Sequence, residues 1–329
     1  MTWQTIATLR VPRTANDIED TVQDETHQTT EEPTETSRWA QVIANPTSGG
    51  RGAPAAVPAL LDTLAALGLQ SEIAYTTADT SPQEIAARAA DRGAALVVAV
   101  GGDGTISAVG AGLIGRDVPL GIVPLGTYNN IARSLGIAPR LEDALDVLRT
   151  GVPRRIDVGR ANEHTFLEIA GVGLDARLFP HAEQIKRGRW RRVGALYRAL
   201  ERYRPNRLRI ELADGTRIVS RPMIALVSNL PYFGVGFAVA PDATADSGDL
   251  VLSLFERFTR LELLRHFVMT LSGRRVIDPR IRVFRSSQIR VSGVARQMRF
   301  QADGTVLGRT PVLFRTDPQA LTVLAPAIR

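Results

Sequence analysis

Residues 94–100 form an unbroken apolar run, AALVVAV, that stops abruptly at the glycine-rich stretch GGDGT at 101–105. A strand that is apolar at every position is typical of a parallel sheet with helices on both faces. Small residues dominate the next ten positions, where a helix is expected. The chain is therefore predicted to pass from a buried strand through a glycine turn into a helix, with one carboxylate, Asp103, inside the turn.

The same alternation of strand and helix runs through the first half of the chain. Further strands are predicted at 40–44, at 70–77 and within 119–127, and helices at 53–69, 81–93, 128–137 and 141–151. Ser81 before Pro82 suits an N-cap residue followed by proline at the first helical position. The alternation predicts an open α/β sheet over residues 38–155.

Strand patterns replace this alternation after residue 155. The stretches 206–230, 248–256, 280–293, 297–305 and 310–317 all suit strands, and 260–273 suits a helix. Residues 156–316 are therefore expected to be a mainly antiparallel β domain. Residues 1–37 hold eight acidic residues against two arginines and are expected to form a disordered acidic tail.

Composition excludes several classes of site. The chain has no cysteine, which excludes disulfides and thiolate zinc sites. Its one lysine, Lys186, lies in the context IKRGR, so there is neither a Walker A motif nor the strand lysine of a protein kinase. No apolar run approaches the roughly 18 residues that span a bilayer, and no secretory signal is apparent at the start. A cytoplasmic location is expected.

Three glycine-containing turns follow three of the predicted strands: Asn45–Gly50, Gly101–Thr105 and Leu125–Thr127. In an open α/β sheet, ligands bind beyond the carboxyl ends of the strands. Glycine lets backbone N–H groups approach phosphate oxygens, and a helix N-terminus adds partial positive charge. The three turns together predict a polyphosphate site. Asp103 could then bind a Mg²⁺, bind a ribose hydroxyl or orient neighbouring backbone, and the plain alternative is a turn aspartate that stabilises its own loop.

The stretch GVGLDA at 171–176 fits the dinucleotide pattern G-x-G-x-x-A and offers a rival interpretation. It lies in the β-rich half, and the region about 20 residues further on is rich in arginine rather than acidic. A nicotinamide-dependent dehydrogenase is therefore disfavoured.

Several ordered motifs, taken together, resemble one family. They are ANPTSGG at 44–50, GGDGT at 101–105, PLGTYNNIARSLGI at 124–137, GVGLDA at 171–176, NLPYFGVGFAVAPDATADSGDL at 229–250 and ADGT at 302–305. Over residues 39 to about 327 the chain resembles the diacylglycerol kinase catalytic-domain family. Its nearest branch is the bacterial soluble lipid kinases, which are related to sphingosine kinases.

The resemblance implies an α/β plus all-β fold. An open α/β nucleotide-binding domain would be followed by an antiparallel β-sandwich that binds the lipid, with the active site in the interdomain cleft. Residues 317–329 would return to the first domain. The implied reaction is ATP-dependent phosphoryl transfer to the hydroxyl of a lipid such as diacylglycerol or a sphingoid base, with ATP and Mg²⁺ as cofactors.

Site residues follow from the resemblance position by position. Asp303 would be the base that accepts the lipid hydroxyl proton, although the Asp-Gly pair taken alone favours a hairpin turn. Asp246 and Asp249 would lie at a structural Mg²⁺ site. The expected nucleotide contacts are Asn45, Thr76, Gly101, Gly102, Asp103, Gly104, Thr105, Ile106, Ser107, Gly126, Thr127 and Asn129.

Three positions depart from the family pattern. Asn130 and Ser247 stand where the family usually has Asp, and Thr305 stands where it usually has Glu. The change at Ser247 removes the best ligand of the structural Mg²⁺ site. The changes at 247 and 305 keep open the alternative of a non-catalytic regulator that binds nucleotide or lipid.

The segment 186–209 holds ten basic residues against one acid, with Trp190, Tyr197 and Tyr203 interleaved. Basic residues with interfacial aromatics suit peripheral, salt-sensitive docking on a membrane surface. A solvated helix with an aromatic core stripe remains the alternative. Nucleic acid is disfavoured because no nucleic-acid motif accompanies the basic run. The oligomeric state is open, and a dimer is compatible with the sequence.

Overall fold

The first four strands are parallel, as the alternation of strands and helices predicts. They lie in the order β2-β1-β3-β4, and β3 pairs with both β1 and β4. Their bounds are β1 (Trp39–Ala44), β2 (Gln70–Tyr75), β3 (Leu96–Gly101) and β4 (Leu120–Pro124). Every residue of β3 and β4 is buried, which explains why neither strand alternates polar and apolar residues. The computed structural model describes residues 38–48, 52–77, 79–173, 203–234, 236–271 and 278–327.

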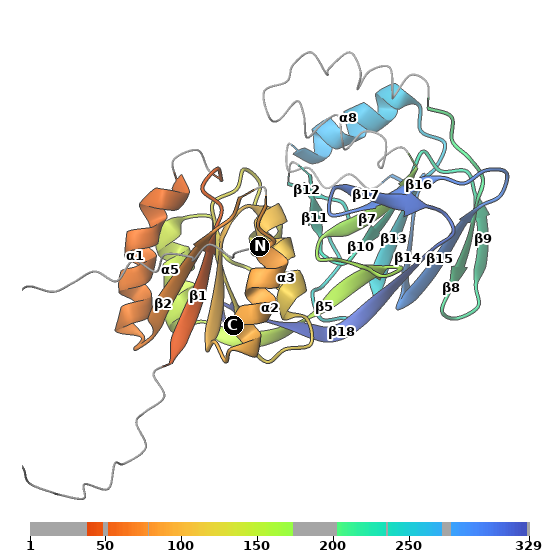
Figure 1. Cartoon of the computed structure of the whole chain (residues 1–329). Coiled ribbons are helices and arrows are strands. Elements are labelled where there is room, and N and C mark those ends of the chain that lie inside the picture. The colour runs from red at the N-terminus through yellow and green to blue at the C-terminus, as the bar shows by residue number, and fades with distance from the viewer. Residues whose placement is uncertain are drawn as a thin grey trace, which may run out of the picture. The chain divides into compact units, whose positions relative to one another are not determined.

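Helices cover both faces of this parallel sheet (Figure 1). α1 (Gly52–Ala66) and α5 (Leu141–Thr150) bury Leu60, Leu64 and Leu148 against one face. α2 (Pro82–Asp91) and α3 (Asp103–Leu113) bury Ala86 and Ile106 against the other. Ser81 Oγ accepts a hydrogen bond from the backbone N–H of Glu84 at 3.3 Å, which confirms the predicted N-cap of α2.

One long strand connects the parallel sheet to the β-rich half of the chain. β18 (Val312–Ala325) pairs in parallel with β4, and antiparallel with β5 (Val152–Ala161) and β15 (Gln288–Gly293). The sheet then continues through β8 (Leu208–Leu212) to β9 (Arg217–Ser220), while β6 (His164–Phe166) pairs with β5. The predicted domain boundaries at 155 and 316 fall inside β5 and β18, and they stay predictions.

A second sheet is antiparallel throughout and has the order β14-β13-β10-β7-β16-β17. Its strands are β7 (Ile169–Gly173), β10 (Ile224–Ser228), β13 (Leu250–Phe255), β14 (Ile281–Ser286), β16 (Arg299–Ala302) and β17 (Thr305–Arg309). One apolar core unites it with the antiparallel part of the first sheet. Phe300 and Phe314 meet edge to face in that core, with ring centroids 6.4 Å apart. The predicted α/β domain with an antiparallel β-sandwich is confirmed.

Two short elements lie where the two halves of the chain meet. α4 (Asn130–Ser134) contacts β11 (Tyr232–Phe233), which forms a small hairpin with β12 (Phe237–Ala238). The guanidinium of Arg133 lies over the Tyr232 ring, 4.1 Å from its centroid. α4 is thereby joined to the β-rich half.

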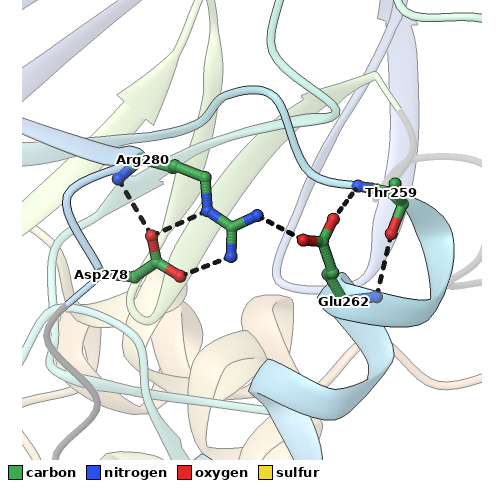
Figure 2. A network of polar contacts seen from close by, with 4 residues as sticks. All are labelled: Thr259, Glu262, Asp278 and Arg280. Atoms are coloured by element: carbon green, nitrogen blue, oxygen red, sulfur yellow. Dashed lines mark hydrogen bonds and ion pairs between the residues drawn. The ribbon is translucent and has the colours of Figure 1, made fainter.

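A polar network fixes the start of α8 (Arg260–Leu271), as Figure 2 shows. Thr259 and Glu262 form a capping box: Glu262 Oε2 accepts from Thr259 N at 2.8 Å, and Thr259 Oγ1 accepts from Glu262 N at 3.3 Å. Arg280 donates to Glu262 Oε1 at 2.8 Å and to both oxygens of Asp278. These hydrogen bonds lower the pKa of Glu262 to about 2.

This depressed pKa predicts a pH-dependent contribution to stability. A carboxyl group whose pKa is lowered by folding stabilises the protein above its ordinary pKa, and the contribution is lost as the pH falls toward the folded value. Glu262→Gln should therefore lower the thermal unfolding midpoint at pH 7. The difference from the parent should shrink as the pH falls from about 4.5 toward 2.

Unfolding midpoints measured by calorimetry between neutral and acid pH test this expectation. Glu163→Gln on the exposed turn between β5 and β6 is the matched control, because it removes the same charge outside the network. A deficit of Glu262→Gln that stays constant with pH would contradict a role for the ionised carboxylate.

Candidate functional site

The glycine turns after β3 and β4 lie at the same edge of the parallel sheet. Gly101 pairs with Pro124 in register, and Leu125 N donates to Gly101 O at 2.8 Å. The two turns touch through backbone: a Cβ on Gly126 would lie 2.6 Å from the Cα of Gly102. Real side chains do not approach so closely, so the absence of a side chain at 126 is what lets the two turns meet.

The turn after β1, at 45–50 in the sequence, is linked to the start of α3 by side-chain hydrogen bonds. Asn45 Nδ2 donates to Thr105 Oγ1 at 3.3 Å, and Asn45 Oδ1 accepts from Thr47 N at 3.0 Å. A Cβ on Gly101 would lie 2.7 Å from Thr105 Oγ1, so the glycine makes room for this hydroxyl. The predicted nucleotide residues Asn45, Gly101 and Thr105 thus form one packed unit.

Asn129 braces the turn after β4. Its φ is 51°, and its Oδ1 accepts from Gly126 N at 2.8 Å while its Nδ2 donates to Gly126 O at 3.1 Å. Asparagine tolerates this left-handed conformation better than most residues. Asn129 therefore shapes the loop that exposes Thr127.

Asp103 links the glycine turn after β3 to the start of α4. Its Oδ1 accepts a hydrogen bond from the backbone N–H of Ile131 at 3.0 Å, in the first turn of α4. Of the roles open to Asp103 from the sequence, orientation of neighbouring backbone is therefore one that the structure displays. The carboxylate at the start of α3 fixes where α4 begins.

Gly104 differs from its neighbours because the protein itself does not need a glycine there. The residue is exposed in the first turn of α3, and an added Cβ would meet nothing within 4 Å. Glycine costs roughly 1 kcal/mol relative to alanine inside a helix. Open space beside a helix N-terminus fits the approach of a phosphate group.

The remaining predicted nucleotide residues differ in access. Thr76 is half-buried after β2, and its N–H donates to Ala44 O at 2.9 Å. Ile106 is fully buried in the core, and its N–H donates to Gly102 O at 3.0 Å. Their roles toward a nucleotide stay predictions.

Asp303 lies in the tight turn between β16 and β17. Its φ is 41° and that of Gly304 is 82°, a pair of left-handed residues typical of a two-residue hairpin. Asp303 N donates to Ile169 O at 2.9 Å, and Gly304 N donates to Gln301 Oε1 at 2.8 Å. The expected turn is present, and it aims the carboxylate inward.

The Asp303 carboxylate accepts four hydrogen bonds. Ser107 Oγ and Leu167 N each donate to Oδ2 at 2.7 Å. Glu168 N and Ile169 N donate to Oδ1 at 2.9 and 3.1 Å. Ser107 belongs to α3, and the other three donors are consecutive backbone groups leading into β7. One carboxylate therefore joins the glycine-turn side of the chain to the β-sandwich.

Burial raises the pKa of Asp303 above the ordinary value of an aspartate, and the four hydrogen bonds act in the opposite direction. A carboxylate with a raised pKa holds a proton more firmly and is a better general base than an ordinary aspartate. The pKa of Asp214, in the exposed turn between β8 and β9, is instead lowered by its hydrogen bonds to Thr216.

The expected structural Mg²⁺ site does not fit the residues present. Asp246 Oδ2 accepts from Arg154 Nη2 at 2.7 Å, and Ser247 Oγ lies 3.4 and 3.2 Å from the carbonyl oxygens of Thr244 and Asp249. Asp157 holds the same loop from inside by accepting from Gly248 N. Within the described ranges, no group of three or more Asp, Glu or His side chains could hold a metal ion.

The GVGLDA motif, which resembles a dinucleotide-binding turn, lies in a different kind of element. Gly171 and Gly173 lie within β7, in the middle of an antiparallel sheet, rather than in a turn between a strand and a helix. Residues 174–176 of that motif lie outside the described residues, as does 186–202 of the basic segment.

Sequence reasoning missed the donors at 167–169 and two buried polar side chains, Asn130 and Glu168. From the sequence, Asn130 stands out only because the family usually has Asp at this position. Glu168 interrupts the apolar stretch FLEIAGVG at 166–173, and that interruption was a usable signal. A charged residue in an otherwise buried segment requires partners.

These features define a class: a two-part protein in which glycine turns at the edge of a parallel sheet meet a buried carboxylate from a β-sandwich. Residues 40–161 match the family model of the diacylglycerol kinase catalytic domain, and residues 168–325 match that of the YegS C-terminal NAD kinase beta sandwich-like domain. The chain belongs to the diacylglycerol kinase family, and its class of enzyme is lipid kinase.

Named relatives agree with this assignment, and a solved structure shares the fold. The chain is 32% identical over 280 residues to a diacylglycerol kinase of Bacillus subtilis, which covers 83% of this chain and 91% of that protein. It is 29% identical over 293 residues to one of Mycobacterium tuberculosis, covering 86% and 94%. A crystal structure of a diacylglycerol kinase from Bacillus anthracis shares the fold, with a TM-score of 0.71 at 19% identity over 89% of this chain and 98% of that one.

Among the described residues, no helix is both long and apolar enough to cross a membrane.

Proposed function

We propose that the protein transfers the γ-phosphoryl group of ATP to the hydroxyl of a lipid such as diacylglycerol or a sphingoid base. The observation that carries the proposal is the hydrogen bond of 2.7 Å between Ser107 on α3 and Asp303 of the β-sandwich. It brings a buried carboxylate to the helix whose first turn follows the GGDGT stretch. A kinase needs its acceptor base beside its nucleotide loop.

On the nucleotide side, the exposed groups are the natural contacts. The first turn of α3 offers backbone N–H groups and a helix N-terminus beside the open space at Gly104. Thr127 is exposed at the neighbouring turn. Asn45, Asp103 and Asn129 hold these turns together by the hydrogen bonds described above, so we assign them a shaping role.

On the acceptor side, Asp303 would serve as general base. The lipid hydroxyl oxygen forms a bond to the γ-phosphorus, the bond from that phosphorus to the ADP oxygen breaks, and the hydroxyl proton passes to Asp303. Three of the four donors to Asp303 are backbone N–H groups, which cannot move away from the carboxylate unless the start of β7 unfolds. Only the Ser107 hydroxyl can rotate away. We therefore infer that the lipid hydroxyl takes the place of Ser107 on Oδ2.

Mg²⁺ would neutralise the phosphate charge that phosphoryl transfer concentrates at this edge of the sheet. Because the loop at Asp246 and Asp249 does not fit a resident ion, we propose that the ion enters bound to ATP. No residue described here is assigned to it.

The transfer itself is tested by following labelled γ-phosphate from ATP into diacylglycerol or sphingosine presented in mixed vesicles. Labelled lipid identifies the substrate class. ATP binding without label in either lipid would favour the regulator alternative and would overturn the proposed reaction.

Asp303→Asn should reduce kcat by about 10²–10⁴-fold, the usual contribution of general base catalysis. The amide also leaves the Leu167 N–H without an acceptor, at a cost of about 1–3 kcal/mol of stability. The KM for ATP should stay near the wild-type value, because the contacts proposed for ATP lie at the glycine turns.

Ser107→Ala is the matched variant, because it removes one donor to Asp303 and leaves the base. Its kcat should fall by less than about tenfold, the equivalent of one ordinary hydrogen bond. If both variants lost the same activity, Asp303 would be only a brace for Ser107, and the base would lie elsewhere.

Gly104→Ala should weaken ATP binding by about tenfold or more, an energy of about 1.4 kcal/mol, because the methyl group enters the space proposed for phosphate. The same change should leave the unfolding midpoint equal or slightly higher, since alanine favours a helix. Titration calorimetry with ATP, alongside thermal unfolding, measures both quantities. An unchanged affinity for ATP would contradict the proposal that its phosphates bind at this loop.

We also propose that the enzyme meets its lipid at a membrane surface through the basic segment 186–209. Binding to anionic vesicles should fall steeply as salt rises, because charge attraction at a surface decays over roughly 10 Å at 0.1 M salt. Co-sedimentation with anionic and neutral vesicles across a salt series measures this. Equal binding to both kinds of vesicle would contradict electrostatic docking.

A further inference from the structure

Beside the Asp303 carboxylate lies a second polar pair with no role in the mechanism above. Glu168, between β6 and β7, is 7% exposed, and Asn130, the first residue of α4, is 2% exposed. Asn130 Nδ2 donates to Glu168 Oε2 at 3.1 Å and to Gly234 O at 3.1 Å. The pair is a further link between the nucleotide half of the chain and the β-rich half.

The orientation of the Asn130 amide follows from its partners. Both hydrogens of Nδ2 are used by oxygen atoms, so the amide must face Glu168 as a donor. Its Oδ1 is buried and has no hydrogen-bond partner within the described structure. Turning the amide over would set that oxygen against the carboxylate and the Gly234 carbonyl. Position 130 is thus matched to an acceptor at position 168.

The same two positions are bound through their backbone to the proposed site. Glu168 N donates to Asp303 Oδ1 at 2.9 Å, and Glu168 O accepts from Asn229 N at 2.9 Å. On the other side, the residue after Asn130 donates its N–H to Asp103. Three hydrogen bonds, joined through the backbone at 130–131 and through Glu168 itself, therefore lead from the GGDGT turn through the Asn130–Glu168 pair to Asp303.

We infer that Glu168 is a positioning residue for phosphoryl transfer: acting through Asn130, its carboxylate sets the nucleotide turns relative to Asp303. The inference rests on the proposed function. It requires one carboxylate and one amide at positions 168 and 130, because a second carboxylate would face the first. A displacement of about 1 Å between reacting groups can cost on the order of 10²-fold in rate.

Asn130→Asp tests the requirement directly, because it sets two carboxylates against each other in a buried site. Two ionised carboxylates at this distance repel each other, and the repulsion is relieved when one of them takes up a proton at lower pH. Other charged groups near the pair include Asp103 on α3, Asp303 on the β16–β17 turn and Arg133 on α4. We expect kcat near neutral pH to fall by about 10²-fold and to recover partly as the pH is lowered, until Asp303 itself is protonated.

A double-mutant cycle separates this coupling from simple damage. Glu168→Gln keeps an acceptor for Asn130 without the charge, and its kcat should fall by less than about tenfold. The combined Asn130→Asp/Glu168→Gln variant restores one carboxylate and one amide. It should recover at least about tenfold of the kcat that Asn130→Asp alone loses, and its pH profile should return to that of the parent. Rescue is partial, because the Gly234 carbonyl still loses its donor.

The measurements are kcat and KM for ATP against pH, and the unfolding midpoint of each variant. Glu163→Gln on the β5–β6 turn is the control for loss of one carboxylate. Additive losses in kcat would overturn the inference, and so would coupling that appears in the unfolding midpoint but not in kcat. If the wild type labels no lipid, the proposed function fails on its own, whereas coupling in the midpoint would still report the contact between the two side chains.

Discussion

The rest of the candidate site depends on the hydrogen bonds that the carboxylate of Asp303 accepts. Three consecutive backbone N–H groups of the β-sandwich side, from Leu167 to Ile169, donate to it, and so does the Ser107 hydroxyl on α3. A buried carboxylate without such partners would cost several kcal/mol. The need to satisfy this one group therefore fixes the position of the β16–β17 turn, the start of β7 and one face of α3 together.

The sequence contains the tetrapeptide Ala-Asp-Gly-Thr twice, at 213–216 and 302–305. Both copies form tight turns, as Asp-Gly pairs predict. At Asp214 the carboxylate is exposed and bonds its own turn, and its pKa is lowered. At Asp303 it is turned inward, and its pKa is raised. Local sequence could predict the turn in both cases, but only residues far away in the chain decide which aspartate is buried.

The same limit separates what was predictable in the fold from what was not. The unbroken apolar run of β3 predicted a strand buried on both faces, and Ser81 with Pro82 predicted where α2 begins. By contrast, the sequence of 154–176 suits two strands joined by a turn, whereas the structure has three strands there, β5, β6 and β7, and β17 was not foreseen. Short strands with half-buried residues carry little periodicity, and their pairing with β16 or β5 is a non-local fact.

Two carboxyl groups, those of Asp303 and Glu262, affect the pH dependence of stability in opposite directions. A raised pKa, as at Asp303, means that folding favours the protonated form, so this contribution is greatest in acid and is lost as the pH rises through the folded pKa. The lowered pKa of Glu262 works in the opposite direction: its contribution is present above its ordinary pKa and is lost toward about 2. Above the ordinary pKa of Glu262 the α8 network therefore stabilises the fold, whereas burial of Asp303 penalises the ionised form of its carboxyl group. This penalty on the ionised form suits the base role proposed for Asp303, because a carboxylate surrounded by cations would have too low a pKa to accept a proton. The donors to Asp303 that the structure displays are accordingly neutral N–H and O–H groups, which hold the carboxylate in place without the charge of a lysine or arginine.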